Sequence, residues 1–303
     1  MMNGERTVMN KNAGYIEPEK TIDHYTLKWI ASIFMLVDHF AYAIIYCVFL
    51  SGRTGTDPWL WGLYRFMRGA GRIAFPLYIY MLADGFFYTR NRMRYLDRLI
   101  IFSLISEIPF DMAFNGTLQS KSPFFPEFSS QNVFFTLALG FGAMWIIDGL
   151  WTHLRNDLRQ GEKGRLESGM RCLLYGTAMA AAAGAAFWAA WIMKTDYKYY
   201  GVMAILTAWA LRHLGSGWLE MAGIGVTLTL GQATYLIAKV GLHSYFANRN
   251  WTEIYSLLAV FIIIFYNGRK GRDSGVIRWG FYLFYPVHLL VLAFLAAFIQ
   301  DWI

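Results

Sequence analysis

Residues 28 to 50 form one apolar segment, KWIASIFMLVDHFAYAIIYCVFL, which carries Asp38 and His39 near its centre. A helix rises about 1.5 Å per residue, so this segment is long enough to cross the roughly 30 Å hydrocarbon core of a bilayer. An ionised carboxylate at that depth costs on the order of 3 kcal/mol, so Asp38 needs a partner. Either the two polar side chains have a chemical role, or they only form hydrogen bonds between helices.

The whole chain is too apolar for a soluble domain. Of its 303 residues, 56% are hydrophobic and only 16% are charged, and the mean hydropathy is +0.34. The net charge of +7 comes from lysines and arginines clustered between apolar segments, which argues against nucleic acid as a partner. We expect the lipid bilayer as a partner, a polar cytoplasmic segment over residues 1–27 and a single transmembrane domain over residues 28–303.

The predicted fold is all-α, a polytopic membrane helix bundle with about nine transmembrane helices. The loops after the even-numbered segments carry most of the basic residues, so the positive-inside rule places these loops and the N-terminus in the cytoplasm. The nine apolar segments are 28–50, 73–89, 99–114, 133–151, 172–193, 200–213, 219–238, 253–266 and 280–299.

Three arginines of LYRFMRGAGR precede the second segment on the predicted outer side, where the same rule disfavours them. These are Arg65, Arg68 and Arg72, and their spacing puts them on one face of a helix. That face is either an interfacial surface or one wall of a polar cavity.

The third segment, LIIFSLISEIPFDMAF, places Glu107 and Asp111 four residues apart on one helical face. Counted from the predicted cytoplasmic end, these carboxylates lie in one layer about 12–18 Å deep, together with His39 and with His288 of the last segment. Because Asp38 and His39 point about 100° apart around their helix, each needs a separate partner.

We expect His39 to face one of the two carboxylates of the third segment, and Asp38 to be neutralised by Arg68 or Arg72. A neutral imidazole in a low-dielectric site is a suitable general base for an amine or hydroxyl that attacks an acyl group. The sequence has no G-x-S-x-G, Walker loop or H-E-x-x-H. Serine hydrolase, nucleotide hydrolase and metalloenzyme chemistry are therefore disfavoured, and we expect no metal.

Five blocks occur in order along the chain: LKWIASIFMLVDHFAY, GRIAFPLYIYMLADGFFYTRNRMRYLDRLIIFSLISEIPFDMAF, QNVFFTLALG, DYKYYGVMAIL and YPVHLLVL. Together they resemble the TraX family of bacterial integral membrane proteins over about residues 27–300. The resemblance implies a multi-pass protein of the bacterial inner membrane that uses acetyl-CoA, because the family's founding activity is acetylation of the amino-terminal residue of conjugative pilin. In the DYKYYG block, Lys198 and Tyr199 lengthen the spacing between Asp196 and Gly201, so we do not count Asp196 among the site residues.

The resemblance extends to transmembrane acetyltransferases that use an intramembrane histidine, which points to His39 as general base or acyl relay. The expected catalytic residues are His39, Asp38, Glu107 and Asp111. Acetyl-CoA is expected to dock from the cytoplasm with its phosphates near basic clusters, although such clusters also set topology and meet anionic lipid headgroups. The expected binding residues are Arg68, Arg72, Asn132, His288, Arg90 and Arg92.

Two other functions stay open. A proton-coupled transporter would also use mid-membrane Asp, His and Glu residues, but the chain shows no two-fold repeat. A non-catalytic scaffold for pilus or envelope assembly would use none of this chemistry. The acetyl acceptor is equally open: a pilin-like N-terminus, an amine or hydroxyl of an envelope glycan, or a lipid headgroup.

Overall fold

The structure is a computed structural model that describes residues 20–51, 57–114, 130–159, 165–213, 215–247 and 252–300. Within these ranges every regular element is a helix, which confirms the all-α class, and the only extended pairings are two isolated bridges. Residues 1–19 of the predicted polar N-terminal segment lie outside the described part of the chain.

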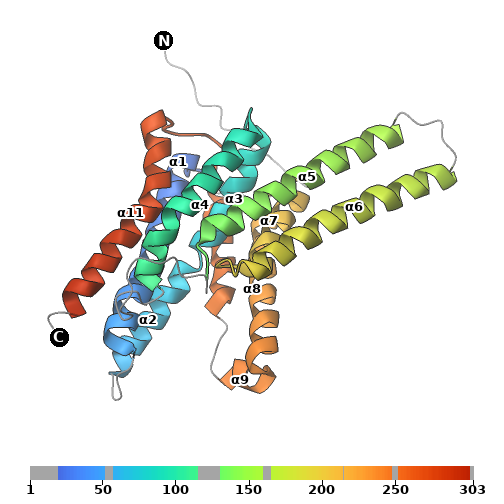
Figure 1. The fold of residues 1–303 in the computed structure, drawn as a ribbon. Coiled ribbons are helices and arrows are strands. Elements are labelled where there is room, and N and C mark those ends of the chain that lie inside the picture. The colour runs from blue at the N-terminus through green and yellow to red at the C-terminus, as the bar shows by residue number, and fades with distance from the viewer. Residues whose placement is uncertain are drawn as a thin grey trace, which may run out of the picture.

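The helices are arranged as a bundle from which one long hairpin extends (Figure 1). Their order is α1 (His24–Phe40), η1 (Ala41–Leu50), α2 (Pro58–Gly71), α3 (Ala74–Tyr88), α4 (Arg92–Phe114), α5 (Val133–Arg159), α6 (Arg165–Ile192), α7 (Lys198–Arg212), α8 (Gly217–Val240), α9 (Leu242–Ala247), η2 (Thr252–Leu258), α10 (Ala259–Ile264) and α11 (Gly275–Gln300). The hairpin consists of α5 and α6, which run side by side.

All nine segments predicted to cross the membrane coincide with helices, but they differ in length. Five helical stretches are long and apolar enough to span a bilayer: His24–Leu50, Val133–Arg159, Leu166–Ile192, Gly217–Val240 and Gly275–Gln300. Helices α3 and α7 have only 15 residues each, about 22 Å at the α-helical rise, which is short of the hydrocarbon thickness. Nine crossings and a cytoplasmic N-terminus therefore stay predictions.

The first span is one continuous helical segment whose geometry changes beside its polar pair. Asp23 caps its start, because its Oδ1 accepts a hydrogen bond from the backbone nitrogen of Thr26 at 2.7 Å. The α-helix ends at Phe40 and continues without a break as the π-helix η1. π-Helical geometry is rare and often marks functional sites, and here it begins at Ala41, two residues after His39.

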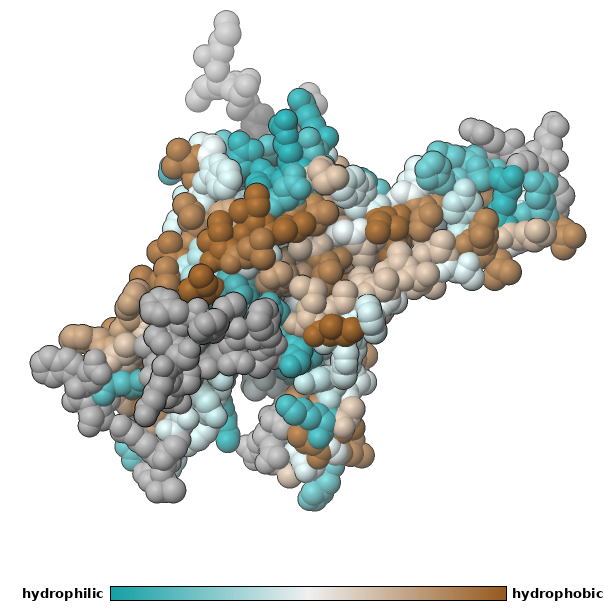
Figure 2. Space-filling model, in the orientation of Figure 1, coloured by the Kyte–Doolittle hydropathy of each residue, from teal (hydrophilic) through white to brown (hydrophobic). Residues whose placement is uncertain are grey.

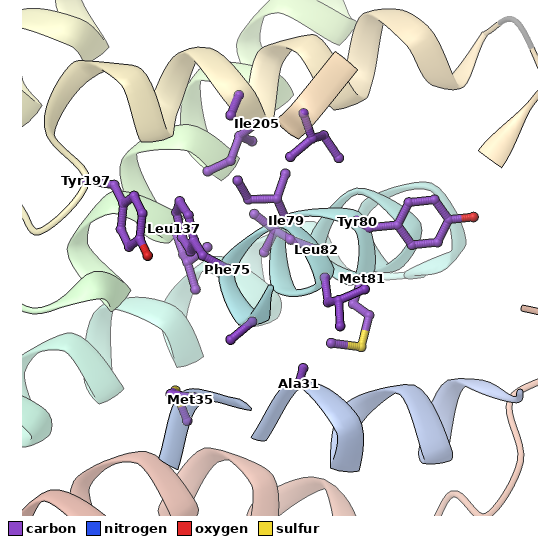
Figure 3. Close-up of a cluster of buried hydrophobic side chains, with 14 of the residues drawn as sticks. Ala31, Met35, Phe75, Ile79, Tyr80, Met81, Leu82, Leu137, Tyr197 and Ile205 are labelled. Carbon is purple, nitrogen blue, oxygen red and sulfur yellow. The ribbon is translucent and has the colours of Figure 1, made fainter. Parts of the chain in front are cut away.

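Helix α3 lies at the centre of the bundle and packs against α1, α5, α7 and α8. Figure 3 shows its side chains Phe75 and Ile79 among Ala31 of α1, Leu137 of α5 and Ile205 of α7. Ten of its 15 residues are buried, as expected of a helix that is apolar on nearly all sides. Helix α3 and the buried side chains packed on it therefore hold together the helices whose ends form the candidate site.

The outer surface is apolar over a broad band. Figure 2 shows hydrophobic residues over α4, α11 and the α5–α6 hairpin, with hydrophilic residues where α4 begins and at the outer ends of α5 and α6. On α6, Leu173 is 69% exposed and Trp188 is 68% exposed. Apolar side chains exposed along whole helices are typical of lipid-facing surfaces. The chain is a membrane-embedded helical protein that contacts the lipid bilayer.

Candidate functional site

A cavity of about 240 Å³ lies where several helix ends meet. The ends of α1, α2 and α4 contribute to it, together with the start of α3, the loops before α5 and α7, and α11. Its aromatic lining includes Tyr42, Phe75, Tyr78, Phe110, Phe114, Tyr197 and Tyr285. Its ionisable lining comprises Asp38, His39, Arg68, Arg72, Asp196 and Lys198. Charged groups inside an aromatic enclosure suit a small ligand with one polar end.

Asp38 is paired with two arginines at the end of α2. Arg68 Nη1 lies 2.5 Å from Asp38 Oδ2, and Arg72 Nη2 lies 3.6 Å from Asp38 Oδ1. This confirms the predicted partners of Asp38. The arginine face of α2 was expected to be either an interfacial surface or a cavity wall. Arg68 and Arg72 form a wall of the cavity, while Arg65 is exposed.

A glycine makes this pairing geometrically possible. A Cβ at Gly71 would collide with the Cβ and carboxylate of Asp38, so only glycine lets α1 and α2 approach this closely. Gly69, two residues earlier, lies against the ring of Tyr255. The sequence RGAGR therefore combines the cationic groups with the small residues that bring them to Asp38.

Arg72 joins a second carboxylate on the side away from Asp38. Its Nη1 lies 3.3 Å from Oε2 of Glu253, a residue of η2 that is only 1% exposed. Gln232 of α8 donates to the same Glu253 oxygen at 3.2 Å, and Arg72 Nη1 also donates to the Tyr197 hydroxyl at 3.4 Å. The Arg72 guanidinium is thus fixed between Asp38 and Glu253.

His39 forms its hydrogen bond with another histidine. Its Nδ1 lies 2.7 Å from Nε2 of His288, and the two ring planes are 5° apart. Phe114 and Tyr285 hold the His39 ring from its edges, with centroids at 5.0 and 5.9 Å. The sequence predicts a carboxylate of the third segment at this place, whereas the structure puts His288 of α11 there.

The protonation pattern of this histidine pair follows from a backbone carbonyl. His288 Nδ1 lies 2.7 Å from the carbonyl oxygen of Phe284, which can only accept, so Nδ1 carries the hydrogen. In a neutral His288 ring, Nε2 then accepts the hydrogen bond from Nδ1–H of His39. Nε2 of His39 is left as the basic nitrogen of a residue that lines the cavity.

Glu107 has a different partner from the one predicted. Its Oε2 accepts hydrogen bonds from the side-chain nitrogen of Asn132 at 2.5 Å and from the Asn132 backbone nitrogen at 3.3 Å. Asn132 also donates to the Ser103 carbonyl at 2.7 Å and accepts from the Phe134 backbone nitrogen at 3.0 Å. Asn132 therefore caps α5 and ties it to α4 through Glu107. Asp111 is buried one turn further along α4.

Arg90 and Arg92 lie at the opposite end of α3 from the cavity and do not line it. Arg90 is exposed in the loop between α3 and α4. Arg92 Nη1 lies 2.8 Å from Asp148 Oδ2, and its guanidinium lies over the ring of Phe86 at 3.8 Å. The 15 residues of α3 separate this region from the cavity by roughly 20 Å.

Glu253 and Tyr285 contact the predicted site residues, but they were not predicted from the sequence. Glu253 precedes a short apolar stretch and resembles an ordinary helix-end acid, so nothing local marks it as the partner of an arginine 181 residues away. Tyr285 lies in YPVH, three residues before His288. This spacing places both side chains on one side of the last helix, so it could have indicated that Tyr285 lies near His288.

The chain is similar to known proteins over most of its length. The family model described as "TraX protein" matches residues 23–296. A protein of Dichelobacter nodosus named "Probable fimbrial assembly protein FimC, serogroup H1" is 29% identical over 291 residues, covering 91% of this chain and 96% of that protein. No solved structure matches the chain.

Proposed function

The chain belongs to the TraX family, and from that premise we propose that it is an integral membrane acetyltransferase of the bacterial inner membrane. Its acetyl donor is acetyl-CoA, and its acceptor is an amine or hydroxyl of a pilin-like N-terminus or an envelope glycan. The name of the Dichelobacter nodosus relative refers to fimbrial assembly, which supports a role connected with pili.

The observation that carries the proposal is the hydrogen-bonded chain from His39 through His288 to the Phe284 carbonyl. It leaves the Nε2 lone pair of His39 as the base at the cavity, and the described residues that line this cavity include no second histidine. When His39 takes a proton, the positive charge is shared with His288 through their common hydrogen bond. The hydrogen bond also fixes the orientation of His39, so that Nε2 is the nitrogen that takes the proton during acyl transfer.

The proposed reaction follows from this base. The acceptor nitrogen or oxygen attacks the thioester carbonyl of acetyl-CoA while His39 Nε2 takes its proton. The carbon–sulfur bond then breaks, the acetyl group stays on the acceptor, and the CoA thiolate receives the proton from His39. Arg68, whose side chain is 22% exposed, is the cation that can face the oxyanion, whereas Arg72 is held by its two carboxylates and positions Asp38.

The cavity has room for the acetyl end of the donor but not for its nucleotide. We propose that the nucleotide stays at the predicted cytoplasmic surface, where Arg90 and Arg92 meet its phosphates. Arg90 is the stronger candidate of the two because Asp148 already engages Arg92. Glu107 and Asn132 support the site by holding α4 against α5 rather than by acting on substrate.

Acetyl-CoA binding and turnover test this proposal against a non-catalytic scaffold. The protein is purified into lipid nanodiscs, and its thermal stability is measured with acetyl-CoA, CoA and the matched nucleotide 3′-phospho-ADP. A ligand at about 100 times its dissociation constant adds about 2.7 kcal/mol to the free energy of unfolding. We expect stabilisation by acetyl-CoA and release of CoA thiol when membrane fractions that contain acceptors are added. Absence of both acetyl-CoA binding and thiol release would contradict the acetyltransferase.

A further inference from the structure

Asp196 is a carboxylate of the cavity lining that forms no ion pair with a described residue. It lines the cavity with its side chain exposed, in the loop between α6 and α7. Among the described residues, no hydrogen bond or ion pair within 4 Å engages its oxygens, in contrast to Asp38 and Glu253. A carboxylate that faces a cavity without an ion-pair partner can bind a ligand of opposite charge there.

The cations around the cavity are engaged elsewhere. Arg68 is directed to Asp38, and Arg72 bridges Asp38 and Glu253. The ammonium of Lys198 lies over the ring of Tyr235, 4.7 Å from its centroid. Of the two carboxylates in the described cavity lining, Asp38 has cationic partners within 4 Å and Asp196 has none.

The backbone holds Asp196 in this position at a conformational cost. Lys194 and Lys198 flank it with φ of 52° and 47°, and in the described ranges they are the only residues other than glycine with positive φ. The loop is fixed by a hydrogen bond from Gln131 N to Lys194 O at 3.1 Å, and by Tyr197, whose ring stacks on Phe75 at 3.6 Å. Left-handed backbone at residues with side chains is strained and clusters at functional sites.

We infer that Asp196 is the specificity-determining residue of the cavity and binds the ammonium group of the acceptor. The inference deepens the proposed function, on which its catalytic part rests. The ammonium, R–NH₃⁺, pairs with Asp196 and gives one proton to His39 Nε2. The freed amine then attacks the thioester, and the overall change converts R–NH₃⁺ and acetyl-CoA into R–NH–acetyl, CoA thiol and one released proton. A hydroxyl acceptor gains nothing from Asp196, because it brings no charge.

Binding of two isosteric probes tests the inference without any need for turnover. The probes are 2-phenylethylammonium and 2-phenylethanol, which share an aromatic ring suited to the cavity and differ in the charged group. Dissociation constants are obtained from thermal stabilisation of the purified wild-type protein, Asp196→Asn, Asp196→Glu and the control Asp97→Asn, which removes an exposed carboxylate of α4.

We expect wild type and Asp97→Asn to prefer the ammonium, and Asp196→Asn to bind it about tenfold or more weakly with unchanged affinity for the alcohol. Asp196→Glu restores part of the preference. Lys198→Gln removes the nearest competing cation and strengthens ammonium binding. Equal ammonium affinity in wild type and Asp196→Asn, or weaker binding by Lys198→Gln, overturns the inference.

Acetyl transfer to 2-phenylethylamine tests the ammonium site at Asp196 and the acetyltransferase function separately. Asp196→Asn should raise KM for the amine about tenfold or more, whereas the control Asp97→Asn should leave this KM unchanged. Ammonium binding that depends on Asp196, in a wild-type protein that transfers no acetyl group, contradicts the acetyltransferase and supports the site. Transfer that is intact in both proteins contradicts the site alone.

Discussion

His39 and His288 share one hydrogen bond between nearly coplanar rings, with 2.7 Å from Nδ1 to Nε2 and 5° between the planes. The two residues are 249 positions apart and come from the first and last long helices. Because the Phe284 carbonyl orients His288, the backbone of α11 sets the tautomer of a side chain on α1. The relationship makes His288 a positioning residue and His39 the reacting one.

Two replacements of His288 should distinguish the effect of its hydrogen bond on activity from the effect of its size. In His288→Phe, Nδ1–H of His39 loses its acceptor, so acetyl transfer should fall about tenfold, the equivalent of one hydrogen bond. The side-chain oxygen of His288→Gln can still accept, and this variant should retain more activity than His288→Phe. Equal rates in both variants, each measured at an equal folded fraction, would show that the hydrogen bond does not position His39.

The Asp38 pair should contribute to stability in proportion to its burial. Asp38→Ala leaves Arg68 and Arg72 without their shared anion and should lower the free energy of unfolding by about 3–5 kcal/mol. The control is Asp157→Ala at the pair Arg171–Asp157, which has a similar distance of 2.6 Å but side chains 29% and 32% exposed. That control should cost below about 1 kcal/mol. Chemical denaturation in detergent gives both values, and equal losses would contradict a buried role for Asp38.

Two glycines of α2 should respond oppositely to alanine. Gly71→Ala places a methyl group against Asp38 and should cost about 1–3 kcal/mol of stability, with a drop in activity as α1 and α2 separate. A Cβ at Gly62 meets nothing within 4 Å, so Gly62→Ala should stabilise the helix by about 0.5–1 kcal/mol. Thermal unfolding of both variants measures this, and a neutral Gly71→Ala would mean that the helices are less closely packed.

Cysteine labelling tests the predicted orientation. In a protein with Cys47 and Cys172 changed to serine, single cysteines replace Met93, which is 55% exposed at the start of α4, or Trp59, which is 65% exposed at the start of α2. A membrane-impermeant maleimide added to intact cells should label Trp59→Cys and not Met93→Cys. The reverse pattern would place the N-terminus outside and remove the proposed cytoplasmic route of acetyl-CoA.

The positions of the helices and the partners of Asp38 could be predicted from the sequence, because both depend on local sequence pattern. Apolar length predicts where helices lie, and the spacing of Arg68 and Arg72 puts both on one face beside a membrane-depth carboxylate. The partner of His39 could not be predicted in the same way. Depth along an axis places His39, Glu107 and His288 in one layer, but rotation about each axis depends on packing between distant helices.

Asn132 and Glu253 illustrate the same limit. Asn132 was expected in the binding site, yet its side chain serves as the cap of α5, a role that becomes visible only when the start of that helix is known. Glu253 enters the Arg72 network through a short 3₁₀ helix whose place beside α2 and α8 has no sequence signal.

The most direct measurement of the central claim compares His39→Gln with the wild type in nanodiscs. Acetyl-CoA turnover is recorded together with acetyl-CoA affinity and the folded fraction, and His153→Gln, an exposed position on α5, serves as the matched control. We predict that turnover by His39→Gln falls by about 10²–10⁴ while affinity and folding stay near those of the wild type and of His153→Gln. Near-normal turnover by folded His39→Gln would contradict the assignment of His39 as the base.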